Sequence, residues 1–399
     1  MADSIEGLRV AIAGGSLGGL LAALELRAIG CDAHVYERSA VRLEGRGAGI
    51  VLHPATTGFL ERRGSFDLDR VSSSAASLRY LDASGAVAFE EPIAYRFTSY
   101  ATLYAALIDA LPSDRYAFGR AVVAASPTSD DRVAVNLSDG STVAADLLVG
   151  ADGIRSTVRS MLFPQVRPAY AGYVAWRGTV LDRDLPAAAD ALGGRLTYHV
   201  GQKTHMLTYE IPAPDLAAER SINWVWYRNL DVPDLDDVLT DPTGIRHDLS
   251  LAPGQVRPAH RDALVAAAAD LPPPFTALVR ATPEPFLQVV VDLEVPRMVR
   301  GRICLLGDAA FALRPHVAVG TAKAADDARA LAGALAEAAD VPEALRIWEP
   351  ERLTLARSAA ARSREVGERA QFRGTFTPGD PQVAFGLRRP KDGSYPDLT

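Results

Sequence analysis

The chain has 399 residues, 48% of them hydrophobic and 23% charged, and its formal net charge at pH 7 is −7. This length predicts more than one domain, each with a sizeable core. The acidic balance argues against nucleic acid or an anionic membrane as a partner, and no apolar run approaches the ~18 residues of a membrane-spanning helix, so we expect a cytoplasmic protein.

The amino-terminal region predicts a βαβ unit. Residues 8–13 form a short apolar run ended by glycine, which is typical of a buried parallel strand. Residues 20–29 have helical spacing and stop at Gly30, and residues 32–38 indicate a second strand. The whole segment has the length of about 30 residues that a dinucleotide-binding βαβ unit needs.

A glycine-rich loop joins the first strand to the helix. Gly14 permits a tight turn, and Gly19 permits close packing of helix on strand. The helix N-terminus then presents free N–H groups and a partial positive charge to a pyrophosphate. Ser16 replaces the usual middle glycine and can donate its hydroxyl to phosphate. The expected phosphate-binding residues are Gly14, Gly15, Ser16, Leu17 and Gly19.

The second strand ends at an acidic residue, Glu37, at the spacing expected for hydrogen bonds with a ribose. The neighbouring Arg38 either stacks on an adenine or stays in solvent. Further along, residues 45–52 form another glycine-rich turn followed by an apolar stretch, and residues 104–111 indicate a helix.

Two more glycine-bearing segments follow predicted core strands. One is Gly150-Ala151-Asp152-Gly153 after residues 147–149, and the other begins at Gly307-Asp308 after residues 303–306. A fold that brings them and the first loop to one side of a sheet places backbone amides and two carboxylates around one ligand. The three segments together therefore predict a bound flavin adenine dinucleotide (FAD).

Between these two segments the pattern changes to alternating strands, near residues 196–200, 206–211 and 222–227. Apolar residues alternate with polar and aromatic ones, which predicts an antiparallel sheet with one face turned to something other than solvent. We expect this sheet to form a substrate domain inserted into the FAD domain. The expected ranges are 1–171 for the first part of the FAD domain, 172–292 for the substrate domain, 293–340 for the second part, and 341–399 for a C-terminal helical region and tail.

The later segments resemble the fingerprints of the single-component FAD-dependent aromatic hydroxylases. The resemblance rests on Gly150–Ser156 and on Gly307–Ala310 followed by Pro315. It implies an α/β fold with a Rossmann-like FAD-binding domain, an inserted antiparallel-sheet substrate domain and a C-terminal helix. It also implies that the Asp152 segment contacts the FAD pyrophosphate and the nicotinamide nucleotide, and that Asp308 binds the ribityl chain. NADH or NADPH supplies the electrons, and no metal is expected.

Within this family the chain resembles the hydroxypyridine hydroxylases, at residues 96–100, 170–178, 314–324 and 376–387. Several departures from the broader family fit this subgroup: Tyr100 replaces an arginine near the flavin phosphates, Phe311 replaces a frequent histidine, and Ala318-Val319-Gly320 replaces a glycine-rich turn beside the isoalloxazine. The remaining residues expected to contact the cofactor are Val51, Tyr100, Pro315, Ala318, Val319 and Gly320.

The resemblance implies hydroxylation of a hydroxylated aromatic ring, a hydroxypyridine such as 2,6-dihydroxypyridine. In that chemistry reduced flavin and O₂ form a C4a-hydroperoxide, which transfers OH to an electron-rich ring carbon. A base near a ring hydroxyl helps, because ionisation raises the nucleophilicity of the ring. A dry pocket protects the reactive intermediate.

Four side chains are candidates for proton transfer at the substrate. His205 and Tyr209 share one face of a predicted strand by its period of two, and form a plausible acid/base pair if that face meets the flavin. His53 follows the glycine-rich turn, and His316 lies in the loop expected to pass the isoalloxazine. Histidine suits proton transfer near neutral pH. Trp226 and Tyr227 are expected either to wall the pocket or to pack in the core.

Other classes of protein fit less well. A flavin-dependent halogenase needs a lysine in the first domain, and no lysine precedes Lys203. A plain NAD-dependent dehydrogenase leaves two of the three glycine segments unexplained, and an inactive scaffold predicts loss of Asp152 or Asp308. An FAD-dependent epoxidase or Baeyer–Villiger-type oxygenase acting on a polycyclic natural product stays open, because fold does not determine reaction.

The expected partners are a small aromatic substrate, O₂ and NAD(P)H. The long predicted helix at about residues 342–371 either forms a homodimer contact or caps the FAD domain.

Overall fold

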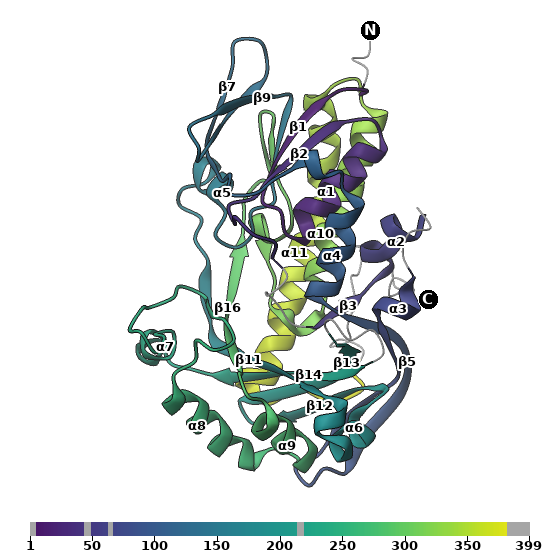
Figure 1. Cartoon of the computed structure of the whole chain (residues 1–399), viewed down its shortest axis with the longest axis vertical. Coiled ribbons are helices and arrows are strands. Elements are labelled where there is room, and N and C mark those ends of the chain that lie inside the picture. Colours follow the sequence, from purple (N-terminus) through teal and green to yellow (C-terminus); the bar gives the residue numbers. More distant parts are fainter. Residues whose placement is uncertain (1–4, 44–48, 63–66, 214–218, 381–399) are drawn as a thin grey trace.

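The computed structural model describes residues 5–43, 49–62, 67–213 and 219–380. Three sheets organise these residues: a largely parallel six-stranded sheet, a mixed ten-stranded sheet and a small antiparallel three-stranded sheet. In Figure 1 the six-stranded sheet lies in the upper half with α1 beside it, the ten-stranded sheet crosses the lower half, and α11 extends down toward the ten-stranded sheet. No described helix is long and apolar enough to cross a membrane.

The six-stranded sheet has the order β17-β18-β10-β1-β2-β6. Its strands are β1 (Arg9–Ala13), β2 (Asp32–Tyr36), β6 (Tyr116–Ala117), β10 (Leu147–Gly150), β17 (Val299–Arg300) and β18 (Ile303–Leu305). β1 pairs in parallel with β10, and β10 pairs in parallel with β18. The carboxyl ends of these three strands therefore meet at one edge, which confirms that the three glycine-bearing segments lie on one side of a sheet.

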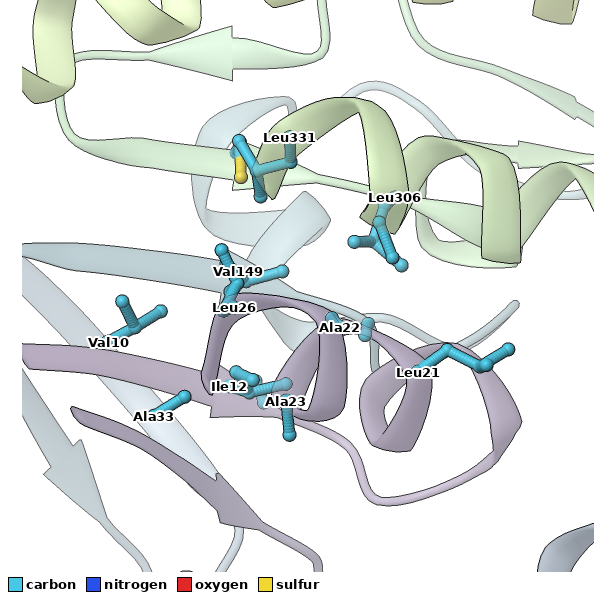
Figure 2. Packing of buried hydrophobic residues seen from close by; sticks show 14 of the residues in the cluster. Val10, Ile12, Leu21, Ala22, Ala23, Leu26, Ala33, Val149, Leu306 and Leu331 are labelled. Atoms are coloured by element: carbon cyan, nitrogen blue, oxygen red, sulfur yellow. The ribbon is translucent and has the colours of Figure 1, made fainter. Parts of the chain in front are cut away.

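The core beside this sheet is built from apolar residues on short strands and one helix. Helix α1 (Leu17–Ala28) buries Leu20 and Leu24 almost completely and packs against α10 (Gly320–Glu337). Figure 2 shows the packing, in which Val10, Ile12 and Val149 from the strands belong to the same cluster as the α1 side chains. Burial of these strands on both faces explains their unbroken apolar runs.

The turn into α1 requires glycine at two positions. Gly14 has a φ of +96°, and a Cβ on Gly19 would lie 1.9 Å from the carbonyl oxygen of Gly14. The tight turn and the close helix–strand contact predicted for these two residues are both present. Helix α1 starts at Leu17, three residues earlier than its apolar pattern suggests, because the glycines themselves form its first turn.

The ten-stranded sheet has the order β15-β16-β11-β14-β13-β12-β4-β5-β3, with β19 pairing to β16. Its later strands are β11 (Ala169–Leu181), β12 (Arg195–Gly201), β13 (Thr204–Pro212), β14 (Arg220–Asn229), β15 (Ser250–Leu251), β16 (Phe286–Glu294) and β19 (Phe311–Ala312). One face buries an apolar layer under α6 (Pro186–Leu192), α8 (Pro258–Ala267) and α9 (Pro273–Ala281). The other face is turned toward the nucleotide-binding half.

Strands from the first hundred residues complete this sheet. They are β3 (Gly49–Leu52), β4 (Ser73–Leu81) and β5 (Val87–Ser99), and β4 pairs in parallel with β12. The residues between 49 and 99, placed by sequence in the first part of the FAD domain, thus belong by hydrogen bonding to the sheet of the predicted substrate domain. Local patterns do not reveal this, because the partner strand lies more than a hundred residues away.

The remaining elements complete the layers. The small sheet consists of β7 (Val122–Pro127), β8 (Val133–Leu137) and β9 (Thr142–Ala145), and the remaining helices are α2 (Pro54–Arg62), α3 (Leu68–Val71), α4 (Tyr100–Ala110), α5 (Thr157–Leu162), α7 (Val232–Val238) and α11 (Val341–Glu368). The apolar face of α11 packs inside the chain, on α10 and on the loop at Pro315–Val317, and a π-helical turn, Arg369–Arg373, follows it. The predicted cap on the FAD domain therefore accounts for this helix within one protomer. Residues 45–48 of the predicted glycine-rich turn and the tail beyond residue 380 lie outside the described residues.

Candidate active site

A groove of about 470 Å³ runs along the carboxyl edge of the parallel sheet. Gly14 and Ser16 from the first glycine segment, Asp152 from the second and Asp308 from the third all line it. The other predicted phosphate-binding residues lie beneath this surface: Gly15 faces the ring of Tyr116, Leu17 is buried in the core, and Gly19 sits under Gly14. The groove thus combines a helix N-terminus with the carboxylates of Asp152 and Asp308, and Glu37 also lines it.

Glu37 shapes the groove as well as lining it. Its carboxylate accepts hydrogen bonds from the backbone N–H groups of Gly15 and Ser39, both at 2.8 Å. The acidic residue at the end of β2 therefore holds the glycine turn, and its remaining lone pairs are available to a ribose. Arg38 is exposed and lines the same end of the groove.

Two residues that depart from the common family pattern contact each other. The hydroxyl of Ser16 lies 2.8 Å from the hydroxyl of Tyr100, which is the first residue of α4. Both side chains line the groove beside the N-terminus of α1. Two neutral donors thus stand where an arginine would add a positive charge.

Asp152 caps a helix. Its carboxylate accepts from the backbone N–H of Thr157 at 2.7 Å, from Val158 at 3.1 Å and from the Ser156 hydroxyl. Burial nevertheless raises the pKa of this carboxyl above its usual value, the hydrogen bonds opposing the shift. Asp152 therefore fixes the start of α5, and with it the strand–turn–helix segment that forms one wall of the groove.

Asp308 stands where the groove opens into a second cavity. Its side chain is exposed in this space. The surrounding protein raises the pKa of the carboxyl, and the positive charge of Lys323 partly offsets this by lowering it. Among the described residues no hydrogen bond to this carboxylate is present. A carboxylate that faces the groove without a protein partner fits a polyhydroxylated chain such as the ribityl of FAD. The residues present thus suit the cofactor.

The second cavity has a volume of about 360 Å³ and shares Tyr100, Ile154 and Asp308 with the groove, so the two spaces are continuous. Its floor is the free face of the ten-stranded sheet, and its walls come from β3, β5 and the loop before α10. All four predicted proton-transfer residues line it, namely His53, His205, Tyr209 and His316.

Strand β13 presents His205, Leu207 and Tyr209 to the cavity, as its period of two predicts, while Met206 packs into the apolar layer on the other face. The same alternation on β14 brings Tyr227 to the cavity. Trp226 therefore does not wall the pocket: it packs in the opposite layer and donates its indole N–H to the Thr204 hydroxyl at 2.6 Å.

Tyr209 is held by packing alone. Its ring stacks on Phe97 with centroids 4.2 Å apart, and a Cβ on Gly49 would lie 2.4 Å from the ring. No hydroxyl partner for Tyr209 exists within the part of the chain that the structure describes. Burial raises the pKa of this phenol well above its ordinary value, so the hydroxyl stays protonated and faces the cavity as a donor.

His205 and His316 lie side by side, with ring centroids 5.1 Å apart and Tyr227 about equally close to both. The side-chain nitrogen of Gln371 lies 3.2 Å from Nδ1 of His205, and the Tyr173 hydroxyl lies 2.6 Å from Nε2 of His316. Burial lowers the pKa of His205 to about 3 and that of His316 well below its usual value. Both rings are therefore neutral at pH 7.

The tautomer of His53 follows from its partner. Its Nε2 lies 2.8 Å from the carbonyl oxygen of Ala318, which can only accept, so this nitrogen carries the proton. Nδ1 then keeps its lone pair, and no group within the described ranges bonds to it. Burial lowers the pKa of this imidazole. His53 is thus neutral at the cavity wall, with Nε2 bonded to the loop before α10 and Nδ1 buried.

The loop before α10 contributes the remaining predicted contacts. Pro315, Ala318, Val319 and Gly320 line the cavity opposite the sheet, as does Val51 of β3. Ala318 has a φ of +54°, a left-handed conformation that glycine adopts at lower cost. The loop thus keeps the shape of a glycine-rich turn without a glycine at this residue.

Comparisons with known proteins agree with this geometry. Residues 170–292 match a family model described as FAD binding domain-like, and residues 290–363 match one described as FAD binding domain. The chain is 38% identical to the 2,6-dihydroxypyridine 3-monooxygenase of Paenarthrobacter nicotinovorans, over 95% of this chain and 96% of the relative. The chain belongs to the single-component FAD-dependent aromatic hydroxylases.

Solved structures of such hydroxylases have the same fold. The 2,6-dihydroxypyridine-3-hydroxylase of Arthrobacter nicotinovorans superposes with a TM-score of 0.93 at 36% identity, covering 99% of this chain and 100% of that one. HpxO of Klebsiella pneumoniae, solved with FAD and uric acid, superposes with a TM-score of 0.74 at 26% identity, covering 94% and 90% of the two chains. The protein is therefore an FAD-dependent monooxygenase.

Three residues of this hydroxylase site escaped the sequence reasoning. Tyr173 and Arg177 lie on the cavity face of β11, and alternation from Ala175 in the Tyr170–Gly178 motif was the signal that could have revealed them. Gln371 had no local signal, because it reaches the site from the π-helical turn after α11.

Proposed function

We propose that this monooxygenase hydroxylates a hydroxypyridine, with NADH as electron donor and O₂ as oxygen source. The observation that carries the proposal is the free sheet face of the cavity, which presents a neutral imidazole, His205, and a protonated phenol, Tyr209, to the space where the ring would bind. The similarity to 2,6-dihydroxypyridine 3-monooxygenase supports the same ring class.

The size of the cavity supports a single-ring substrate. About 360 Å³ lies at the low end of ligand pockets, and the isoalloxazine of the cofactor must share this space. A single ring needs less of this space than the polycyclic substrate that an epoxidase or Baeyer–Villiger oxygenase of this fold would take.

The chain's own residues would act as follows. Asp308, Ser16 and the N-terminus of α1 hold FAD, which when bound and reduced activates O₂ for transfer of a hydroxyl group to the ring. Tyr209 donates a hydrogen bond to a ring oxygen, and Gln371 donates to Nδ1 of His205, which leaves the His205 proton on Nε2 as a second donor. His53 donates from Nε2 to the Ala318 carbonyl and so holds the loop that borders the ring.

The test is anaerobic reduction of the bound flavin by NADH, with and without hydroxypyridines and phenols. Acceleration by a hydroxypyridine, followed by one hydroxylated product per NADH when O₂ is admitted, is the expected result. Equal rates without any ring compound contradict the proposal and favour the epoxidase or Baeyer–Villiger alternative. The same assay with NADPH tests the preference for NADH. The homodimer and the cytoplasmic location stay predictions.

A further inference from the structure

Two arginines line the cavity, and their surroundings differ. Arg314 is ion-paired twice, with Asp292 at 2.8 Å and with Glu368 at 3.1 Å. Arg177 forms no ion pair with any residue in the described ranges, and its Nε is buried without a hydrogen-bond partner. A positive charge that is partly removed from water and has no counter-ion lowers the stability of the folded protein. A negatively charged ligand in the cavity would remove this cost.

The register of the sheet places Arg177 on the substrate side. It lies on β11 opposite Val225 of β14, and both residues belong to the face that lines the cavity. Its positive charge lowers the pKa values of Tyr209 and Tyr227, against the stronger effect of burial, so the guanidinium acts on both phenols. Arg177 thus carries its charge among the residues proposed to bind the ring.

The rest of this surface is neutral. Burial keeps His53, His205 and His316 unprotonated at pH 7, and keeps Tyr209 protonated. One carboxyl lines the described cavity, that of Asp308, and it stands at the junction with the nucleotide groove, where we assign it to FAD. The described substrate surface therefore has one unpaired charge, and it is positive.

We propose that Arg177 is an oxyanion-binding residue, so that the enzyme takes its substrate as a mono-anion. This inference rests on the proposed function and names the ionisation state of that substrate. An anionic oxygen neutralises the guanidinium through charge-assisted hydrogen bonds, and the negative charge makes the ring more electron-rich. A substrate hydroxyl releases its proton to solvent when it binds in this way, and a substrate carboxylate arrives already ionised.

The experiment measures dissociation constants against pH on the oxidised FAD-loaded enzyme, without NADH and without air, from changes in the flavin spectrum. The probe for a ring oxyanion is 2,6-dihydroxypyridine, the probe for a carboxylate is nicotinate, and a neutral reference is 2-methoxypyridine. The variants are Arg177→Gln and Arg177→Lys. Arg228→Gln is the matched control, because Arg228 lies on the opposite face of the same sheet, over the ring of Trp226 at 4.9 Å.

For the native enzyme we expect the dissociation constant of 2,6-dihydroxypyridine to fall about tenfold per pH unit up to the pKa of the free compound, and then to level off. Arg177→Gln should raise the plateau value roughly tenfold to hundredfold and abolish the pH dependence. Arg177→Lys should keep the pH dependence, since it keeps the charge, which shows that any loss in the Gln variant is not a failure to fold. Arg228→Gln and 2-methoxypyridine should show no such effect.

The outcomes separate the two proposals. If Arg177→Gln keeps the native constant and its pH dependence, the anion site is wrong, while hydroxylation by the native enzyme still supports the proposed function. If nicotinate binds through Arg177 and hydroxypyridines do not bind, the anion site holds with a carboxylate ligand and the proposed function is wrong. If neither anion binds the native enzyme, both fail.

Discussion

The hydroxyl groups of Ser16 and Tyr100 lie 2.8 Å apart, although 84 residues separate them in the chain. One sits at the N-terminus of α1 and the other begins α4, and both line the nucleotide groove. Tyr100→Phe removes one hydroxyl and leaves the ring, so we expect FAD affinity to fall by roughly twofold to tenfold. Fluorescence titration of the apoprotein with FAD measures this.

Tyr104→Phe is the control for that substitution, because Tyr104 stacks on Tyr100 but directs its hydroxyl to Tyr116 inside the core. It should bind FAD as the native chain does. Equal affinities of native and Tyr100→Phe protein contradict a role for this pair at the phosphates.

Removal of the Asp308 carboxylate should have a larger effect. It has no hydrogen-bond partner among the described residues, so Asp308→Ala takes no hydrogen bond from the protein scaffold and removes an acceptor from the cofactor. We expect FAD affinity at least about tenfold lower. The flavin content of purified protein and a dissociation constant test this, and a variant that retains tight FAD refutes the assignment.

Tyr209→Phe should lower the rate of hydroxylation without changing the stability of the protein. The hydroxyl has no described protein partner while the ring packs on Phe97, so the variant should fold and hold FAD normally. Hydroxylation should drop by about tenfold or more, with NADH oxidation diverted to H₂O₂. Product per NADH is the measurement, and unchanged coupling removes Tyr209 from the site.

A substitution at Gly49 tests how closely the backbone packs against the ring of Tyr209. A methyl group there would lie 2.4 Å from Tyr209, so Gly49→Ala should lower the free energy of unfolding by about 1–3 kcal/mol. Gly333→Ala in α10 meets nothing within 4 Å and should instead stabilise the helix by roughly 0.5–1 kcal/mol. Urea denaturation of both variants checks the contrast, and two equal effects contradict it.

His205 makes stability depend on pH. Its pKa is about 3 in the folded protein, against about 6.5 in an unfolded chain. Between these values the unfolded chain binds a proton that the native protein does not, so the free energy of unfolding falls as pH drops from about 6.5 toward 3, and is unaffected by this group above that range. Denaturant midpoints at pH 7 and pH 5 should differ less in His205→Asn than in the native enzyme, and an equal difference contradicts the assignment.

Sequence periodicity predicted the parts of the site that depend on one element. The alternation of β13 placed His205 and Tyr209 on one face, and the glycines before α1 marked the nucleotide turn. The same rule, applied to β14, separates Tyr227 in the cavity from Trp226 in the core, and the sequence reading left that choice open.

The parts that escaped prediction depend on long-range contacts. Gln371 meets His205 across 166 residues, and nothing in its own neighbourhood marks it. The membership of β4 in the large sheet is equally invisible, because a strand's partner depends on the whole fold and not on its local pattern. The helices predicted to start at residues 20 and 104 start earlier, at Leu17 and at the cavity residue Tyr100.

The parallel pairing of β4 with β12 bears on protein engineering. The floor of the pocket and one of its walls come from two stretches that are separated in the chain. A chimera that exchanges only residues 172–292 between two hydroxylases would therefore pair β4 of one protein with β12 of the other. A transplant of substrate specificity has to carry residues 49–99 together with residues 169–294. During synthesis β4 cannot pair with β12 until about half of the polypeptide has left the ribosome. Until then the edge of β4 has no partner strand.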